Sequence, residues 1–200
     1  MNSKLGFYSA VIVSITTLLF GISMIVGNPS LGYLVCMILS WGYILLTCAF
    51  YTETIEDRKS VALGGVVFGC IYGVLINIVY FTQLTTVANK TATENVIQVL
   101  SYQSIGSLFF NLNLFGYGMM ALSTFLVGIS INSRSKIDKW LKTLLMVHGI
   151  FLISSIAMPI LNLFQNSGDS SALIGIIALL IWCIYFIPIA ILAAIYFRNK

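Results

Sequence analysis

Residues 61–85 read VALGGVVFGCIYGVLINIVYFTQLT and contain no Asp, Glu, Lys or Arg. Crossing the hydrocarbon core of a bilayer, which is about 30 Å thick, takes roughly 20 apolar residues in an α-helix. Backbone polar groups in lipid must be satisfied within the segment, and a helix does this completely. The stretch therefore predicts a helix that spans a membrane.

Five other stretches have the same length and character: 5–26, 31–51, 106–131, 140–163 and 173–197. The composition of the 200-residue chain agrees, since 59% of it is hydrophobic and only 8% is charged, whereas a soluble domain has about 25% charged residues. We expect an all-α fold in which six transmembrane helices form one bundle, and a single domain over residues 1–200.

Three connections between these stretches carry local signals. The turn at 27–30, GNPS, predicts that Pro29 ends one helix and that Ser30 caps the next. Residues 93–100 form either a short amphipathic helix at the membrane surface or an early turn of the fourth span. We favour the second, because no Gly or Pro separates them from the start of the apolar run. A polar turn is expected at 166–171, NSGDSS.

The positive charges predict the orientation, because basic residues accumulate on the cytoplasmic side of a membrane. Six spans place both termini and the second and fourth connections on one side. Nine of the ten basic residues lie there and only Lys90 lies opposite. We therefore expect cytoplasmic termini in a plasma membrane, and the composition, rich in Ile, Asn, Ser and Lys, is typical of a bacterial protein. The nine are Lys4, Arg58, Lys59, Arg134, Lys136, Lys139, Lys142, Arg198 and Lys200.

Small residues recur every fourth position on the third span, at Gly65, Gly69 and Gly73, and Asn77 continues the spacing. Close backbone approach drives helix packing in lipid, so such a stripe predicts that a neighbouring helix lies against it. A seam between two copies of the chain and a surface facing a ligand are the alternatives.

Amide and phenol side chains gather near the predicted outer ends of the third, fourth and fifth spans. Buried amides are costly in hydrocarbon unless they are paired, so we expect them to converge. They form either a closed hydrogen-bond network or a cavity open to the outside. The residues are Asn77, Tyr80, Gln83, Tyr102, Asn111, Asn113 and Asn162.

The only histidine, His148, lies deeper in the fifth span, at the depth of Ser123, Thr124 and Pro188. Pro188 removes a backbone donor inside the sixth span, and Pro159 does the same in the fifth. One interpretation makes both prolines hinges, with Pro188 a gate beside a proton-sensitive ring and Pro159 a bend in the outer part of the fifth span. The other is a neutral imidazole that hydrogen-bonds a carbonyl or a hydroxyl.

Several chemistries lack the residues they need. One histidine and no intramembrane carboxylate cannot build a metal site of two or three ligands, and no phosphate-binding glycine loop occurs. The four cysteines lie singly within apolar runs, without a C-x-x-C pair. No clustered basic face indicates nucleic acid. We therefore expect no metal, no cofactor and no nucleic-acid partner.

The sequence favours a non-enzymatic membrane protein that binds or transports a small neutral or weakly polar molecule between spans three, four and five. Asn77, Asn111 and Asn113 would supply the polar contacts, with His148 below them. An alternative is a membrane subunit or immunity-type protein that docks a partner, or a second copy, through the glycine groove and the basic loops. A less favoured alternative is an intramembrane enzyme that uses His148.

Overall fold

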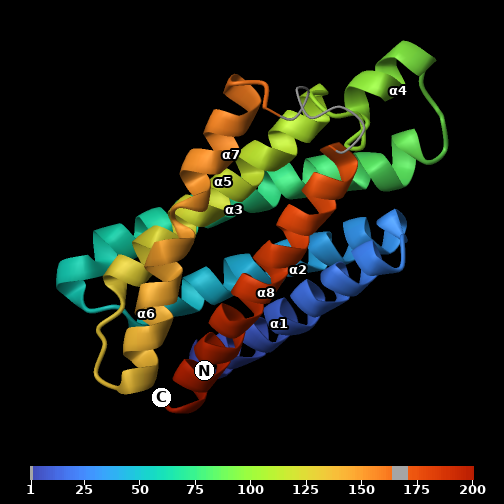
Figure 1. The fold of residues 1–200 in the computed structure, drawn as a ribbon. Helices are drawn as coiled ribbons and strands as arrows, with labels where there is room; N and C mark the ends of the chain where they lie inside the picture. The colour runs from blue at the N-terminus through green and yellow to red at the C-terminus, as the bar shows by residue number, and fades with distance from the viewer. Residues whose placement is uncertain (1, 164–170) are drawn as a thin grey trace.

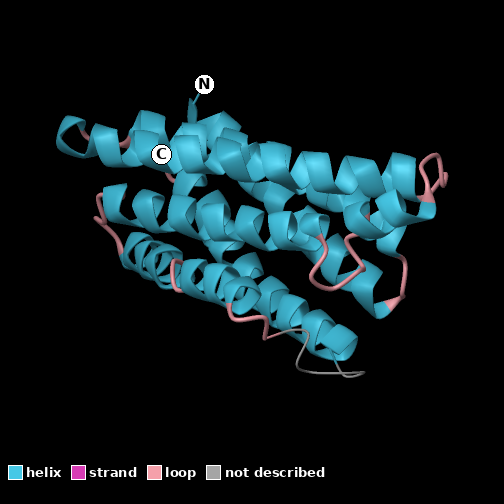
Figure 2. Cartoon of the chain, turned by 90° about the horizontal axis from the view of Figure 1, so that it is seen from above, coloured by secondary structure: helices cyan, strands magenta, loops and turns pink. Residues whose placement is uncertain are grey.

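The computed structural model describes residues 2–163 and 171–200, which form helices joined by turns and loops (Figures 1 and 2). Six segments within the described residues are long and apolar enough to cross a membrane. This confirms the six predicted apolar helices and fits a multi-pass integral membrane protein. The turn predicted at 166–171 lies, except for its last residue, outside the described residues. The helices are α1 (Asn2–Ile25), α2 (Pro29–Glu53), α3 (Lys59–Thr82), α4 (Glu94–Leu100), α5 (Leu108–Ser130), α6 (Lys136–His148), α7 (Phe151–Ile160) and α8 (Ser171–Arg198).

The long helices contact one another in a cyclic order. α1 packs between α8 and α2, α2 packs against α3, α3 against α5, and α5 against both α6 and α7. α6 closes the ring on α8, whereas α7 packs along α5 without an extensive contact to α8. Figure 1 shows α7 and α8 diverging toward the upper end of the molecule. Among the described residues, the interior of the ring is therefore closed on all sides only in the half that contains α6.

Both termini and two connections lie at one end of the molecule, which we call the basic end. The start of α1 meets the end of α8, where Gly6 lies against the ring of Phe197. The connection before α3 meets the end of α5, where the Arg58 guanidinium donates to the carbonyl of Ile131 (3.1 Å). The predicted basic segments thus share one end, and the side of the membrane that it faces stays a prediction.

In the turn between α1 and α2, the residues that end α1 and cap α2 differ from those predicted from the sequence. Gly27 has φ +69°, a conformation that favours glycine, and it ends α1, while the amide of Asn28 bonds back to the carbonyl of Ser23 (2.9 Å). The Asn28 side chain then caps α2 by accepting from the amide of Leu31 (3.1 Å). Pro29 begins α2 instead of ending α1, because a proline in the first turn lacks only a donor that has no intrahelical partner. The prediction of Ser30 as the cap was therefore wrong.

The fourth and fifth spans also depart from the expected pattern. α4 is a separate short helix that ends at Leu100, so the favoured interpretation of 93–100 as an early turn of the fourth span was wrong. The alternative was correct in predicting a separate helix, and its place at the membrane surface stays a prediction. The fifth span is not one helix, since it is interrupted at Gly149 and Ile150 between α6 and α7. Hydrogen bonds of three-residue spacing tighten the chain there, from Gly149 N to Met146 O (3.1 Å) and from Ile150 N to Val147 O (3.0 Å).

Candidate functional site

A cavity of about 590 Å³ lies inside the ring at the end opposite the basic end. Small-molecule sites in proteins are typically about 300–1,000 Å³ and mostly apolar, with a few polar groups. Four long helices, the segment after α4 and the start of α5 contribute to it. Its lining consists of Phe20, Ser23, Met24, Gly27, Asn28, Pro29, Gly32, Tyr33, Tyr80, Tyr102, Gln103, Ile105, Phe110, Gly175, Ile176 and Leu179.

Four aromatic rings form one wall of the cavity. Tyr33 of α2 stacks on Tyr80 of α3, with 5.3 Å between ring centroids. Tyr102 meets both of these rings edge-on, at 6.0 and 5.8 Å, and stacks on Phe110 of α5 at 6.1 Å. Aromatic pairs at these separations stabilise each other beyond simple burial. The wall therefore joins three helices and the segment that follows α4.

Gln83 holds Tyr102 in this wall. Its side chain is buried in the π-helical turn Gln83–Val87 that follows α3. The Gln83 amide nitrogen donates to the carbonyl of Leu100 (2.9 Å), and its amide oxygen accepts from the backbone N–H of Tyr102 (2.9 Å). Gln83 therefore pairs two backbone groups that leave α4, and it positions the cavity wall without lining the cavity.

None of the described residues that line the cavity carries a charge. The polar groups are the amides of Asn28 and Gln103, the hydroxyl of Ser23 and the tyrosine phenols. Burial, with a smaller contribution from Tyr33, raises the pKa of the Tyr102 phenol, so this hydroxyl is neutral at physiological pH. Among the described lining residues a charged ligand would find no counter-ion, and an unpaired charge is costly in an apolar site. The lining therefore suits a neutral molecule.

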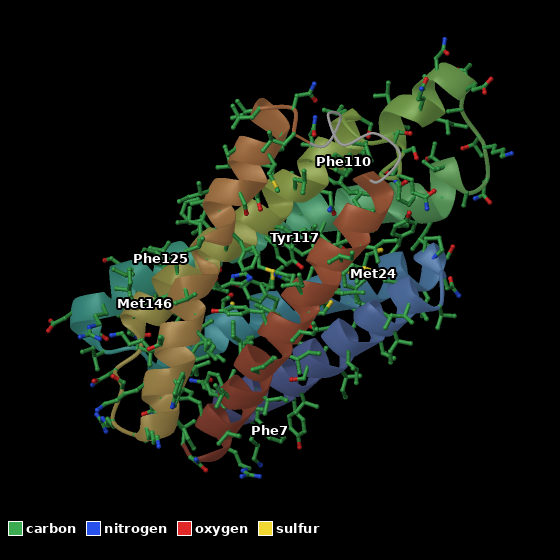
Figure 3. The ribbon with its side chains drawn as sticks, viewed as in Figure 1. Phe7, Met24, Phe110, Tyr117, Phe125 and Met146 are labelled. Carbon is green, nitrogen blue, oxygen red and sulfur yellow. The ribbon has the colours of Figure 1, made fainter. Side chains whose placement is uncertain are left out.

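The floor of the cavity is closed about two helical turns deeper on α5, seven residues beyond Phe110. Tyr117 of α5 spans this layer, because its ring meets Trp182 of α8 edge-on at 5.2 Å and its hydroxyl lies 3.7 Å from the Cys36 sulfur of α2. Figure 3 shows Phe110 near the end of α5 and Tyr117 further along the helix, toward α8. On α3, the hydroxyl of Tyr72 is buried in the same region and has no hydrogen-bond partner among the described residues. The cavity is therefore separated from the basic end by packed aromatic side chains.

His148 lies below this floor, at the end of α6, and is 1% exposed. The indole N–H of Trp182 donates to His148 Nε2 (3.0 Å), and His148 Nδ1 lies 2.8 Å from the hydroxyl oxygen of Thr124. Indole is only a donor, so Nε2 is an acceptor and Nδ1 bears the proton. The Thr124 hydroxyl in turn donates to the carbonyl of Ala121 (2.8 Å). The indole N–H, the imidazole N–H and the threonine hydroxyl each have an acceptor in this series of hydrogen bonds. The arrangement fits the predicted neutral imidazole that hydrogen-bonds a hydroxyl. Both ring nitrogens are occupied, so neither is free to act as a catalytic base.

The remaining predicted amides lie apart from one another. Asn77 is held between α3 and α2, where its nitrogen donates to the Ser40 hydroxyl (2.7 Å) and its oxygen accepts from the Trp41 indole (2.9 Å). Asn111 donates to the carbonyl of Gly106 (3.4 Å). Asn162 follows α7 in a left-handed backbone conformation, with φ +55°. These three amides line no part of the cavity, so the predicted convergence of the whole set does not occur.

The glycine stripe explains why Asn77 faces away from α5. Each step of four residues turns the helix by about 40°, so a long stripe winds around it. A Cβ on Gly65 would meet Val127 of α5 at 2.8 Å, whereas one on Gly73 would meet Ile44 of α2 at 2.5 Å. Gly69 lies between them and contacts both neighbours. The predicted packing role fits this geometry, with two neighbouring helices instead of one.

The prolines do not mark the interruptions in the helices. α8 continues through Pro188, and Pro159 lies one residue before the end of α7. The interruption at Gly149 occurs where the backbone approaches α5, since a Cβ there would lie 2.9 Å from that of Phe125. A pivoting role for the prolines stays a prediction.

Of the predicted site residues, Tyr80 and Tyr102 line the cavity and Gln83 supports it. Asn113 does not line it but is buried on α5 between Phe110 of the lining and Tyr117 of the floor. Sequence analysis missed the contributions of α1, α2 and α8. The aromatic residues Phe20, Tyr33 and Phe110 were visible in the sequence, but nothing in their spacing separates a cavity wall from ordinary packing.

Comparison with protein-family models, with curated proteins and with solved structures found no match to this chain. The structure itself is compatible with a multi-pass membrane protein that has an aromatic cavity at one end, with no charge among the described lining residues.

Proposed function

We propose that this protein binds a small neutral molecule in the aromatic cavity, at the outer side of a plasma membrane. The observation that carries the proposal is the cavity itself: about 590 Å³, lined by aromatic rings and a few neutral polar groups, without a charge among its described lining residues. Its volume lies in the range of small-molecule sites.

The basic end supports the outward direction of the cavity. The connection that contains Arg58 and the start of α6 lie at the end opposite the cavity, and basic residues favour the cytoplasmic side. Phe50 of α2 packs on Tyr196 and Phe197 of α8 near the basic end, at 5.6 and 4.8 Å between ring centroids. A second space, of about 250 Å³, lies near the basic end between α1 and α8, but exposed residues such as Ile15 and Ile191 line it. The larger, aromatic cavity lies at the other end, as in a binding protein or in one state of a transporter.

The competing interpretations gain less from the geometry. Docking through the glycine stripe would need Gly65, Gly69 and Gly73 at the surface, and all three are buried between α2, α3 and α5. An enzyme that used His148 would need a free ring nitrogen beside an open space, and Trp182 and Thr124 occupy both nitrogens.

Native mass spectrometry of the purified protein tests the proposal, because a ligand retained in the cavity adds a discrete mass. Gly175 lines the cavity and has no atom within 4 Å of the position of a Cβ, so Gly175→Trp fills the space with little strain. Ile184→Trp is the matched control, since Ile184 lies on the same helix, is 72% exposed and does not line the cavity. We expect the adduct in the wild type and in Ile184→Trp but not in Gly175→Trp. Equal retention in all three proteins would place the bound molecule elsewhere and refute the proposal.

A further inference from the structure

Asn113 of α5 is the one predicted site residue whose amide is left unsatisfied. Its side chain is 1% exposed, and Oδ1 has no hydrogen-bond partner among the described residues. An unpaired polar group of this kind costs about 1–3 kcal/mol, and buried polar atoms in proteins are nearly always paired. The oxygen therefore needs a partner that the described residues do not supply.

The position of Asn113 on α5 places it between the cavity and its floor. Residues three and four apart share one face of a helix. Phe110, three residues earlier, lines the cavity, and Tyr117, four residues later, forms the floor with Trp182. The side chain of Asn113 therefore lies in the layer directly below the cavity, on the face that the cavity wall and the floor share.

Asn111 shows that an amide at this end of α5 has a local alternative. Two residues away on the same helix, its nitrogen donates to the carbonyl of Gly106 at 3.4 Å, and it does not line the cavity. Asn113 instead projects into the interior. Asn111 therefore serves as a control for Asn113, because the Asn111 amide is hydrogen-bonded at the start of α5 whereas the Asn113 oxygen has no partner among the described residues.

We propose that Asn113 is the polar contact at the base of the cavity, where its carboxamide oxygen accepts a hydrogen bond from a hydroxyl or N–H group of the bound molecule. This inference rests on the proposed function and narrows the ligand class. The aromatic rings hold the apolar body of the molecule, and Asn113 selects a molecule whose inner end carries a hydrogen-bond donor. A buried oxygen left unpaired penalises an analogue without that donor, which is how such a site discriminates.

Trp182 can report on this site, because it contacts Tyr117 at the floor and the chain has only two other tryptophans. Trp41→Phe and Trp140→Phe leave Trp182 as the sole emitter. The probes are 4-bromophenol and 4-bromotoluene, which differ only in a hydroxyl against a methyl group and carry a bromine that quenches indole emission on contact. Dissociation constants are measured by quenching in lipid nanodiscs for this background and for the same background with Asn113→Leu or Asn111→Leu.

We expect saturable quenching by both probes, with Asn113→Leu weakening the binding of 4-bromophenol roughly 3- to 10-fold, as for one hydrogen bond. The same substitution leaves 4-bromotoluene binding unchanged or tighter, and Asn111→Leu changes neither constant. If Asn113→Leu weakens both probes equally, or neither, the inference about Asn113 is overturned while the proposed function stands. If neither probe gives saturable quenching before Asn113 is changed, the proposed function itself fails. Asn113→Ala removes the same oxygen with less bulk and replaces Asn113→Leu if the leucine variant does not fold.

Discussion

The hydrogen-bond chain through His148 makes a quantitative prediction about stability. Trp182→Phe removes the donor to Nε2 and leaves a buried acceptor unpaired. His148→Leu removes the acceptor and leaves the indole N–H unpaired. In the double variant Trp182→Phe/His148→Leu neither group remains, and the Thr124 hydroxyl still donates to Ala121. The double variant should therefore lose less stability than the sum of the two single variants.

The magnitude follows from the burial and geometry of the pair. Hydrogen bonds between membrane helices contribute about 0.6 kcal/mol on average and at most about 1.7 kcal/mol, and leaving a buried partner unsatisfied costs about 1–3 kcal/mol. His148 is 1% exposed and Trp182 is 5% exposed, so the pair belongs at the upper end of the membrane range. We expect each single variant to cost about 2 kcal/mol and a coupling energy of about 1–1.5 kcal/mol between them.

The assay is unfolding in mixed micelles with increasing SDS, followed by circular dichroism. Trp140→Phe is the control for loss of an indole, because Trp140 is 57% exposed, and it should change the free energy of unfolding by less than about 0.5 kcal/mol. Additive losses from Trp182→Phe and His148→Leu, with no coupling, would refute the assignment of the His148 nitrogens.

Three further substitutions test other parts of the structure by the same SDS titration. Gly149→Ala should destabilise the protein by about 1–3 kcal/mol, because the added Cβ would lie 2.9 Å from Phe125; an unchanged midpoint would contradict the close approach of α6 to α5. Gln83→Leu should cost about 2 kcal/mol, since it leaves two backbone groups unpaired, and should expose the segment around Tyr102 to added protease; equal proteolysis of the two proteins would argue against the anchoring role. Asn113→Leu should stabilise the ligand-free protein by about 1 kcal/mol, because it removes an unpaired buried amide; a loss of stability would show that the amide has a structural partner.

The sequence predicts the spans well, because hydrocarbon thickness sets helix length and the charges confine the connections. The apolar stretches at 31–51 and 61–85 match α2 and α3 to within a few residues. Comparing depths along the spans also identified one neighbour of His148, since Thr124 bonds its ring, whereas Ser123 bonds Tyr43 and Gly65 instead. These inferences depend on position along a helix axis, which the sequence gives directly.

The candidate site was less predictable, because it depends on the direction in which each side chain points around its helix. Asn77 and Asn113 lie at similar depths, but Asn77 turns toward α2 and bonds Trp41, whereas Asn113 projects into the interior. The cavity lies among α1, α2 and α8 as well as α3 and α5, and only the cyclic order of the helices reveals this. Similarly, the interruption at Gly149 reflects contact with Phe125, which no local signal in the sequence records.

The central claim is that the six helices cross a membrane, with the basic end inside the cell and the cavity open to the outside. Its most direct test is labelling of single engineered cysteines with a membrane-impermeant maleimide, in a variant whose four native cysteines are replaced by alanine. Gln103→Cys reports on the cavity and Lys139→Cys on the basic end, and both positions are exposed. The account predicts that intact bacterial spheroplasts label Gln103→Cys at once and Lys139→Cys only after permeabilisation. Labelling of Lys139→Cys in intact spheroplasts, with Gln103→Cys protected, would contradict it.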